Sequence, residues 1–290
     1  MANNLESNFT RKIMEKTIAP FESSRVLSKN VNTQLFAGSF NPQSGTVVDV
    51  KRPTDHSVIS SADGNISTTR SDIINGKASA TVQNYITVAV DYDEVDEALK
   101  MGDTATLFKD ISRRMVIDLE TKFAAFAVKN TGLLHGTHGQ GVNAWSEVAY
   151  AGALMESSGV PQDKSWCYFL NPYSQAALAD QQRGIGVNPG GSSANEKATV
   201  MDNFAGFTVK TATTLPTYTS SAGADRAGTL TGAPDVTYVT AKDTMTQSIP
   251  VTAFQANLVV KAGEQIQITG RNRLNLSTRQ PIIDATGSSV

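Results

Sequence analysis

A long amphipathic pattern between Asp103 and Asn130 predicts the principal helix of the chain. Its apolar residues recur at steps of three and four, which places them on one helical face: Leu107, Ile111, Met115, Leu119, Phe123 and Phe126. Opposite charges follow one another four residues apart on the other side: Asp110, Arg114, Asp118 and Lys122. Because no glycine or proline interrupts the run, we expect one helix roughly 40 Å long, with an extended segment lying along it.

The N-terminal segment predicts a shorter amphipathic helix. Its apolar residues have helical spacing: Phe9, Ile13, Met14, Ile18 and Phe21. Pro20 is expected to end the helix because proline has no backbone N–H to donate. Two interpretations remain open: the helix packs on its own domain, or it is an arm that reaches a neighbouring subunit.

Two predicted strands, 46–50 and 80–92, enclose a long polar stretch, and the second strand shows clear period-two alternation. Residues 51–79 are polar and carry charges of both signs, and Asp63-Gly64 is typical of a hairpin turn. A connection of this length is unusual in a compact domain. We therefore expect an extended two-stranded flap, with a mobile surface loop as the alternative. The flap residues that we expect to contact another subunit are Lys51, Arg52, Asp63, Arg70 and Asp72.

Helices and strands alternate in the middle of the chain. The acid-rich stretch 91–102 predicts a short helix, because its acids crowd the N-terminal turns and Gly102 can end it. Residues 143–157 predict a helix capped by Asn143, residues 165–170 a strand, and Asn171-Pro172 the start of another helix. Residues 206–213 predict a further strand. This part of the chain therefore has mixed α and β character.

The last third of the chain differs in composition. Residues 217–227 are rich in Ser, Thr, Ala and Gly and indicate a linker. Short strand-like pieces follow, and Lys261–Glu264 is expected to join two of them as a hairpin. We expect a small separate β module whose core includes Val236, Tyr238, Val251, Leu258, Val260, Ile266 and Ile268.

Composition narrows the class of protein. Hydrophobic residues make up 40% of the 290 residues and charged residues 18%, which excludes a wholly disordered chain. The net charge of −2 argues against non-specific binding of nucleic acid by a broadly basic surface. The polar N-terminus is not expected to be a signal peptide, and no apolar run approaches the length of a membrane span. One cysteine, Cys167, excludes an intrachain disulfide.

Candidate chemical motifs are weak. His135 and His138 could share a metal ion, but the glycines around them disfavour a helix and no third ligand lies near in sequence. The glycine-rich residues 184–191 lack the Lys-Ser/Thr pair of a phosphate-binding loop and predict a flexible connection. Cys167 lies within an apolar strand, which favours a packed thiol over a nucleophile. We therefore expect no catalytic residues, no metal site and no cofactor.

Several runs, in this order, resemble the major capsid (coat) proteins of tailed bacteriophages, of the short-tailed phage type with an inserted β domain. They are VAVDYDEVDEAL (88–99), DISRRMVIDLETKFAAFA (110–127), WCYFLNP (166–172), FAGFTVKTATTLP (204–216) and VVKAGEQIQITGRNRLNLSTRQP (259–281). The resemblance covers most of the chain from about residue 35 onward.

The resemblance implies an α+β tailed-phage capsid fold. Residues 1–35 would be the N-terminal arm, and residues 36–140 the peripheral (P) domain, with an extended E-loop at 51–79 and a spine helix at 103–130. Residues 141–216 would be the axial (A) domain. Residues 217–290 would be a small, barrel-like inserted β domain. In such proteins the chain returns from the inserted domain to complete the axial domain, whereas this sequence stops at Val290. The native chain is therefore expected either to continue or to have an unusual ending.

The implied function is that of a structural protein that self-assembles into the icosahedral shell around a phage genome, and not that of an enzyme. Implied partners are copies of the chain in hexamers and pentamers, a scaffolding protein and a portal, with packaged DNA involved only indirectly and no membrane. The shell would form in the cytoplasm of the bacterial host. Two alternatives stay open: a metal-dependent or α/β enzyme using His135 and His138, and a surface-binding module built on the C-terminal β segment.

Overall fold

The computed structural model describes most of the helical part of the chain and portions of the remainder. The described residues are 6–31, 47–51, 60, 62–65, 67, 77–81, 86–89, 104–136, 139–162, 166–183, 197–221, 226–233, 247–284 and 286–288. The chain forms two compact units. Unit 1 comprises Met1–Asn32, Ile86–Ser220 and Lys261–Val290, and unit 2 comprises Thr33–Tyr85 and Ser221–Val260. Helices and strands are both present, which confirms an α+β protein.

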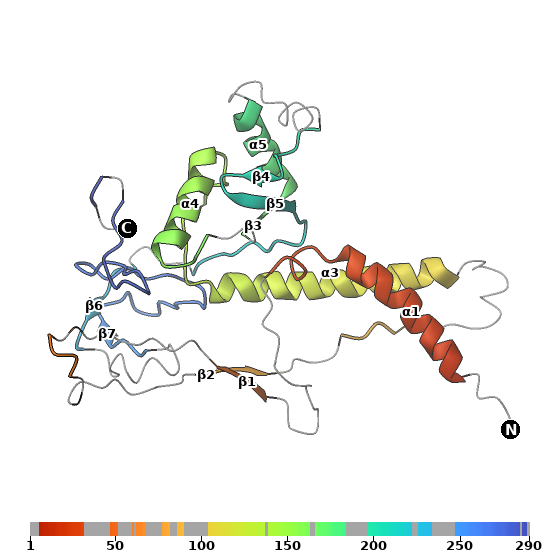
Figure 1. Ribbon diagram of the computed structural model, residues 1–290, viewed down its shortest axis with the longest axis horizontal. Helices are drawn as coiled ribbons and strands as arrows, with labels where there is room; N and C mark the ends of the chain where they lie inside the picture. Colours follow the sequence, from red (N-terminus) through yellow and green to blue (C-terminus); the bar gives the residue numbers. More distant parts are fainter. Residues whose placement is uncertain are drawn as a thin grey trace. The chain divides into compact units, whose positions relative to one another are not determined.

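Two helices of unit 1 lie side by side, α1 (Glu6–Ser24) and α3 (Thr104–Asn130) (Figure 1). Helix α3 confirms the predicted principal helix to within one residue. Helix α1 was predicted to end at Pro20, and that prediction is wrong because the helix continues for one more turn. In that turn the Ser23 hydroxyl donates to the Pro20 carbonyl oxygen (3.1 Å). A proline this close to a helix end disrupts few backbone hydrogen bonds.

The buried face of α3 differs from the predicted one. Its fully buried positions are Ser112, Val116, Glu120 and Ala124, which lie four residues apart. The predicted stripe is only half-buried at its described central positions, and Phe126 is 64% exposed. A shift of one residue rotates the face by about 100°. The buried row includes the polar residues Ser112 and Glu120, and the single hydroxyl proton of Ser112 is shared between Phe108 O (2.7 Å) and Thr17 O (3.1 Å).

An α/β body follows α3, with α4 (Trp145–Ser157) and α5 (Pro172–Arg183) beside a three-stranded sheet (Figure 1). The strands are β3 (Cys167–Leu170), β4 (Asn203–Phe204) and β5 (Phe207–Thr211), in the order β3-β5-β4. Strands β3 and β5 run parallel, and β4 and β5 run antiparallel. These elements confirm the helices and strands predicted between 143 and 213.

The helix caps of the body are partly as predicted. The Asn171 side chain accepts a hydrogen bond from the Ser174 N–H (2.7 Å), which is the expected cap of α5. Helix α4 is capped at Ala144 and not at the predicted Asn143. Instead, the Glu147 carboxylate reaches back from the first turn and accepts a hydrogen bond from the Asn143 N–H (3.1 Å).

The core of the body lies between α4, α5 and the sheet. Its buried members are Val148, Trp166, Leu170, Leu178, Ala179, Val200, Phe204 and Phe207. The ring centroids of Trp166 and Phe207 lie 5.4 Å apart, and the Trp166 indole N–H donates a hydrogen bond to Pro161 O (3.1 Å). Leu178 is fully enclosed. Trp166 and Leu170 of the predicted apolar run therefore belong to this core, and Tyr168 packs against it.

Unit 2 contains two small hairpin-like pairs. Strand β1 (Val47–Lys51) pairs antiparallel with β2 (Lys77–Thr81). A strand had been predicted over 80–92, but β2 ends at Thr81 and residues 86–89 are not a strand. Residues 82–85 and 90–92 lie outside the described part. The five residues of β1 pair with the five residues of β2. The alternation of apolar and polar residues over 80–92 therefore did not show where the pairing ends.

The predicted C-terminal β module is divided between the two units. Strands β6 (Thr229–Leu230) and β7 (Val251–Thr252) pair within unit 2, while residues 261–290 belong to unit 1. The Lys261–Glu264 turn is present, with the Glu264 N–H donating to Lys261 O (3.2 Å). Three predicted core residues are exposed, so that part of the prediction is wrong: Val251, Val260 and Ile266. Val236 and Tyr238 lie outside the described residues.

Gly152 generates a test of the body's core. A Cβ atom there would lie 3.1 Å from the Phe207 ring and 3.7 Å from Trp166. We expect Gly152→Val to lower the free energy of unfolding by about 1–3 kcal/mol through overpacking, measured by urea denaturation. The matched control is Ala153→Val, at the exposed neighbouring position of α4. It should lose only about 0.5 kcal/mol through helix propensity. Equal losses in both variants would contradict the packing assigned to Gly152.

Candidate subunit-contact surfaces

The flap predicted at 51–79 is described at its base and at one turn. Lys51 ends β1 and lies directly opposite Lys77 in the β1–β2 register. Asp63 and Gly64 lie in an exposed turn, as predicted, where Gly64 has a φ of +70° and the Asp63 carboxylate accepts from the Asn65 N–H (3.1 Å). The other predicted contact residues, Arg52, Arg70 and Asp72, lie outside the described part.

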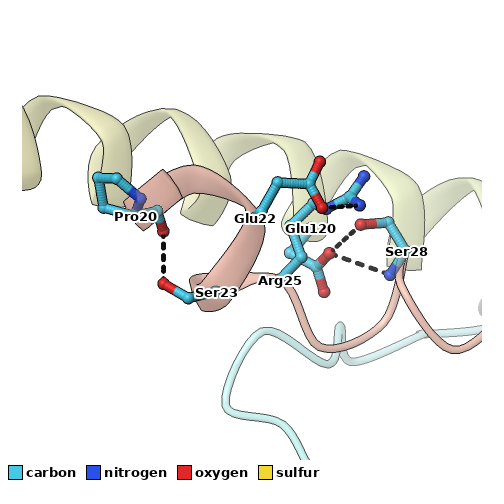
Figure 2. A network of polar contacts seen from close by, with 6 residues as sticks. All are labelled: Pro20, Glu22, Ser23, Arg25, Ser28 and Glu120. Carbon is cyan, nitrogen blue, oxygen red and sulfur yellow. Dashed lines mark hydrogen bonds and ion pairs between the residues drawn. The ribbon is translucent and has the colours of Figure 1, made fainter. Parts of the chain in front are cut away.

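Figure 2 shows a buried carboxylate that joins the N-terminal segment to α3. Glu120 is only 3% exposed and accepts hydrogen bonds from the Leu27 N–H (2.5 Å), the Ser28 N–H (3.0 Å) and the Ser28 hydroxyl (2.6 Å). The two amides bind different carboxylate oxygens. No Lys or Arg in the described ranges forms an ion pair with Glu120. We call Glu120, Leu27 and Ser28 the arm anchor.

Apolar contacts reinforce the arm anchor. Leu27 is 4% exposed and packs with Ala124 of α3 and Ala212, which follows β5. Val26, Phe123, Phe169 and Leu215 surround this cluster. The arm therefore contacts both α3 and the α/β body. Sequence reasoning missed Glu120, although an acid in line with Ser112, Val116 and Ala124 at steps of four was a visible signal.

Two apolar side chains of α1 are exposed to solvent. Met14 and Ile18, four residues apart, are 59% and 58% exposed. Arg25, just beyond α1, forms an ion pair with Glu22 (2.9 Å) and lies 5.9 Å from the Phe21 ring centroid. Elsewhere in unit 1, Phe126 and Tyr173 are also strongly exposed. Exposed apolar side chains at regular helical spacing are typical of contact surfaces.

A hollow of about 400 Å³ lies between residues 134–142, α4 and the sheet. His135, Gln140, Glu147 and Tyr168 contribute polar groups to a lining that is otherwise mostly apolar. Burial, and secondarily the Glu147 charge, raise the pKa of Tyr168 to about 12. The exposed His135 ring lies 6.0 Å from that of Tyr150.

The two predicted histidines are not brought into a visible metal site. His138 lies outside the described residues, and those described contain no group of three or more His, Cys, Asp or Glu placed to hold a metal ion. Cys167 lies half-buried in β3 and forms no disulfide. Among the described helices, none combines the length and apolar character needed to cross a membrane.

The C-terminal segment of unit 1 packs on the ends of two helices. The Asn275 amide donates to Ser157 O (2.7 Å) and the Leu276 N–H to Ser158 O (3.2 Å), at the end of α4. Gly263, with a φ of +94°, lies where a Cβ atom would be 3.0 Å from Lys129 Cα in α3. Near its end, the Thr286 hydroxyl donates to Asp284 and lowers the pKa of that carboxyl.

Comparison with known proteins matches almost the whole chain. The model of a family described as P22 coat protein, gene protein 5, matches residues 1–289. A major capsid protein of Acyrthosiphon pisum secondary endosymbiont phage 1 is 30% identical over 290 residues. That alignment covers 99% of this chain and 68% of the phage protein. Neither match supports the alternative predictions of an enzyme or a surface-binding module.

Tyr168 generates a test of the hollow beside α4. Because its pKa is raised on folding, the unfolded chain loses the phenolic proton first, and stability should fall as pH rises from about 10 to 12. Tyr168→Phe has no phenol to ionise and should lack this part of the loss. In urea unfolding, the free energy of unfolding should therefore fall less between about pH 9 and about pH 11 for the variant than for the wild type. Tyr173→Phe, which removes a hydroxyl from an 89% exposed side chain, is the control. Parallel behaviour of the two variants would refute the burial assigned to Tyr168.

Proposed function

Because the chain belongs to the P22 coat protein family and is a structural major capsid protein, we propose that it builds a phage shell from hexamers and pentamers of itself. The observation that supports this proposal most strongly is the family match over residues 1–289. The proposal includes a scaffolding protein and a portal as partners and assembly in the host cytoplasm, with the packaged DNA involved only indirectly. Shell building is a contact function, and the proposal assigns the chain no catalytic chemistry.

The proposed domains follow the family comparison. Helix α3 supports a spine helix at 103–130 within a peripheral domain of residues 36–140, and the β1–β2 pair supports an E-loop at 51–79. The parallel β3–β5 pair with α4 and α5 supports an axial domain at 141–216. An inserted β domain is proposed at 217–290. The β6–β7 pair supports its β character, while the contacts of 261–284 associate its last part with unit 1.

The flap is proposed to contact a neighbouring copy. Lysines 51 and 77 occupy paired positions in the β1–β2 register, so two basic residues lie at the base of the flap. An acidic surface on another subunit would complement this pair of positions. Charges of both signs at Lys51, Arg52, Asp63, Arg70 and Asp72 would then set the register between subunits more than the strength of their binding.

The arm, residues 1–35, is proposed to combine the two interpretations that the sequence left open. Its anchor and the α1–α3 contact hold it on its own subunit. Met14 and Ile18 remain exposed and are available to a second copy. In a shell, where every subunit is surrounded by others, such a surface need not stay exposed to water.

The assembly proposal is tested by size. Purified protein, alone or coexpressed with a scaffolding partner, should give capsomers or closed icosahedral particles in size-exclusion chromatography and electron microscopy. A compact monomer under both conditions would exclude the proposed shell assembly.

The flap proposal is tested by charge reversal. Arg70→Glu should reduce the yield of shells and leave the melting temperature of the unassembled subunit almost unchanged, because the lost charge pairs act between subunits. The control is Lys197→Glu, the same change at an exposed position outside the flap. Equal damage to assembly and to subunit melting would indicate that the flap packs on its own domain.

A further inference from the structure

The arm anchor is an unusual way to hold a chain segment. The Glu120 carboxylate is buried, yet its hydrogen-bond partners in Figure 2 and its third partner, the Leu27 amide, all belong to the segment just after α1. They lie 92 or 93 residues away in sequence. The buried charge is thus stabilised by backbone amides and one hydroxyl of the arm itself. Such bonds to a charged acceptor are stronger than neutral ones.

We propose that Glu120 is a positioning residue that holds the N-terminal arm in one docked geometry on α3 and allows the arm to be released as a unit while the α/β body stays folded. The inference depends on the proposed capsid function only in the second of its two tests, which measures shell assembly. It assigns to this carboxylate a role in placing the exposed Met14–Ile18 side of α1.

The geometry is specific for a carboxylate because all three groups that bind its oxygens are hydrogen-bond donors. Two neighbouring N–H groups and one hydroxyl approach its two oxygens, so both oxygens must accept. A glutamine of the same shape would place an NH₂ group against at least one of these donors. The segment itself is already folded into a turn, in which the Asn30 N–H donates to Leu27 O (3.1 Å) and the Asn30 amide to Val26 O (2.6 Å). One rigid turn is therefore bound in one orientation.

A second contact fixes the direction of α1. The Ser112 hydroxyl on α3 donates to the Thr17 carbonyl oxygen, two turns along α3 from Glu120. Two attachment points fix the direction of the arm, and the packing of α1 on α3 restricts rotation about the line between them. Met14 and Ile18 keep their exposure in this arrangement. The anchor therefore controls which side of α1 faces away from the subunit.

The same anchor makes release possible. A carboxylate is well solvated by water, so an undocked Glu120 would exchange amide partners for water at a modest net cost. An apolar side chain in place of Glu120 would instead leave a hydrophobic surface of α3 exposed to water whenever the arm detached. A cleft of about 320 Å³ borders the anchor and is lined by Ser24, Arg113, Glu120 and Gln175 among others. Water entering this cleft could solvate the carboxylate as the arm leaves.

Hydrogen exchange on the unassembled subunit tests the proposal directly. Glu120→Gln should speed exchange of the Leu27 and Ser28 amides about ten- to a hundredfold, with faster exchange along α1 and no change in β3, β5 and α5. Ser28→Ala, which removes only the hydroxyl donor, should give a smaller effect at the same amides. Asp118→Asn is the matched control, because it neutralises an exposed acid two residues away that pairs with Lys122 (2.7 Å).

Shell formation supplies the second readout. Glu120→Gln should raise the share of misshapen or open particles in electron micrographs, while Asp118→Asn should assemble as the wild type does. Unchanged exchange at Leu27 and Ser28 would overturn the proposal, as would faster exchange there with normal shells. Loss of protection throughout the body in both Glu120→Gln and Ser28→Ala would also overturn it. If the wild type itself failed to assemble, the capsid proposal would fall, and the exchange data would still decide the anchor.

Discussion

The burial of one carboxylate on α3 is the constraint that joins the N-terminal segment to the rest of unit 1. Helix α3 does not bury its most apolar side. It buries a row of small and polar residues, and this is stable only because Ser112 and Glu120 find partners on other segments. Leu27 then completes the contact by packing with Ala124 and Ala212. The hydrogen bonds set the position of the arm, and the apolar cluster adds much of the binding energy.

This arrangement leaves much apolar surface uncovered, as expected of a subunit meant for a shell. Met14, Phe126 and Tyr173 are all more than half exposed on helices or at a helix start. In a monomeric enzyme such residues would favour aggregation. Under the proposed assembly, they are available as surfaces for other copies. The family assignment and the exposure pattern therefore agree.

Local signals in the sequence predicted the helices and the strands of the α/β body well, and the strands of unit 2 and the site poorly. Helix α3 carried a helical period, α4 was bounded by local signals and α5 carried an Asn-Pro start, so local information was sufficient for them. The orientation of α3 was mispredicted because Ser112 and Glu120 look solvent-facing when their partners are unknown. Alternation over 80–92 could not reveal that β1 offers only five pairing residues. The row at steps of four could have indicated that Glu120 is buried, but not which segment it binds, since its partners lie more than ninety residues away.

The packing of residues 261–284 has a consequence for the time course of folding. This segment closes against the ends of α3 and α4 through Gly263 and Asn275, and the Asn275 bond to Ser157 spans 118 residues. During synthesis it emerges from the ribosome only after the residues of both helices have emerged. The helix ends remain uncovered until then, and closing so long a loop carries an entropic cost that makes folding slower. A growing chain therefore passes through a stage in which α3 and α4 are present but their C-terminal ends have not yet received the segment that covers them.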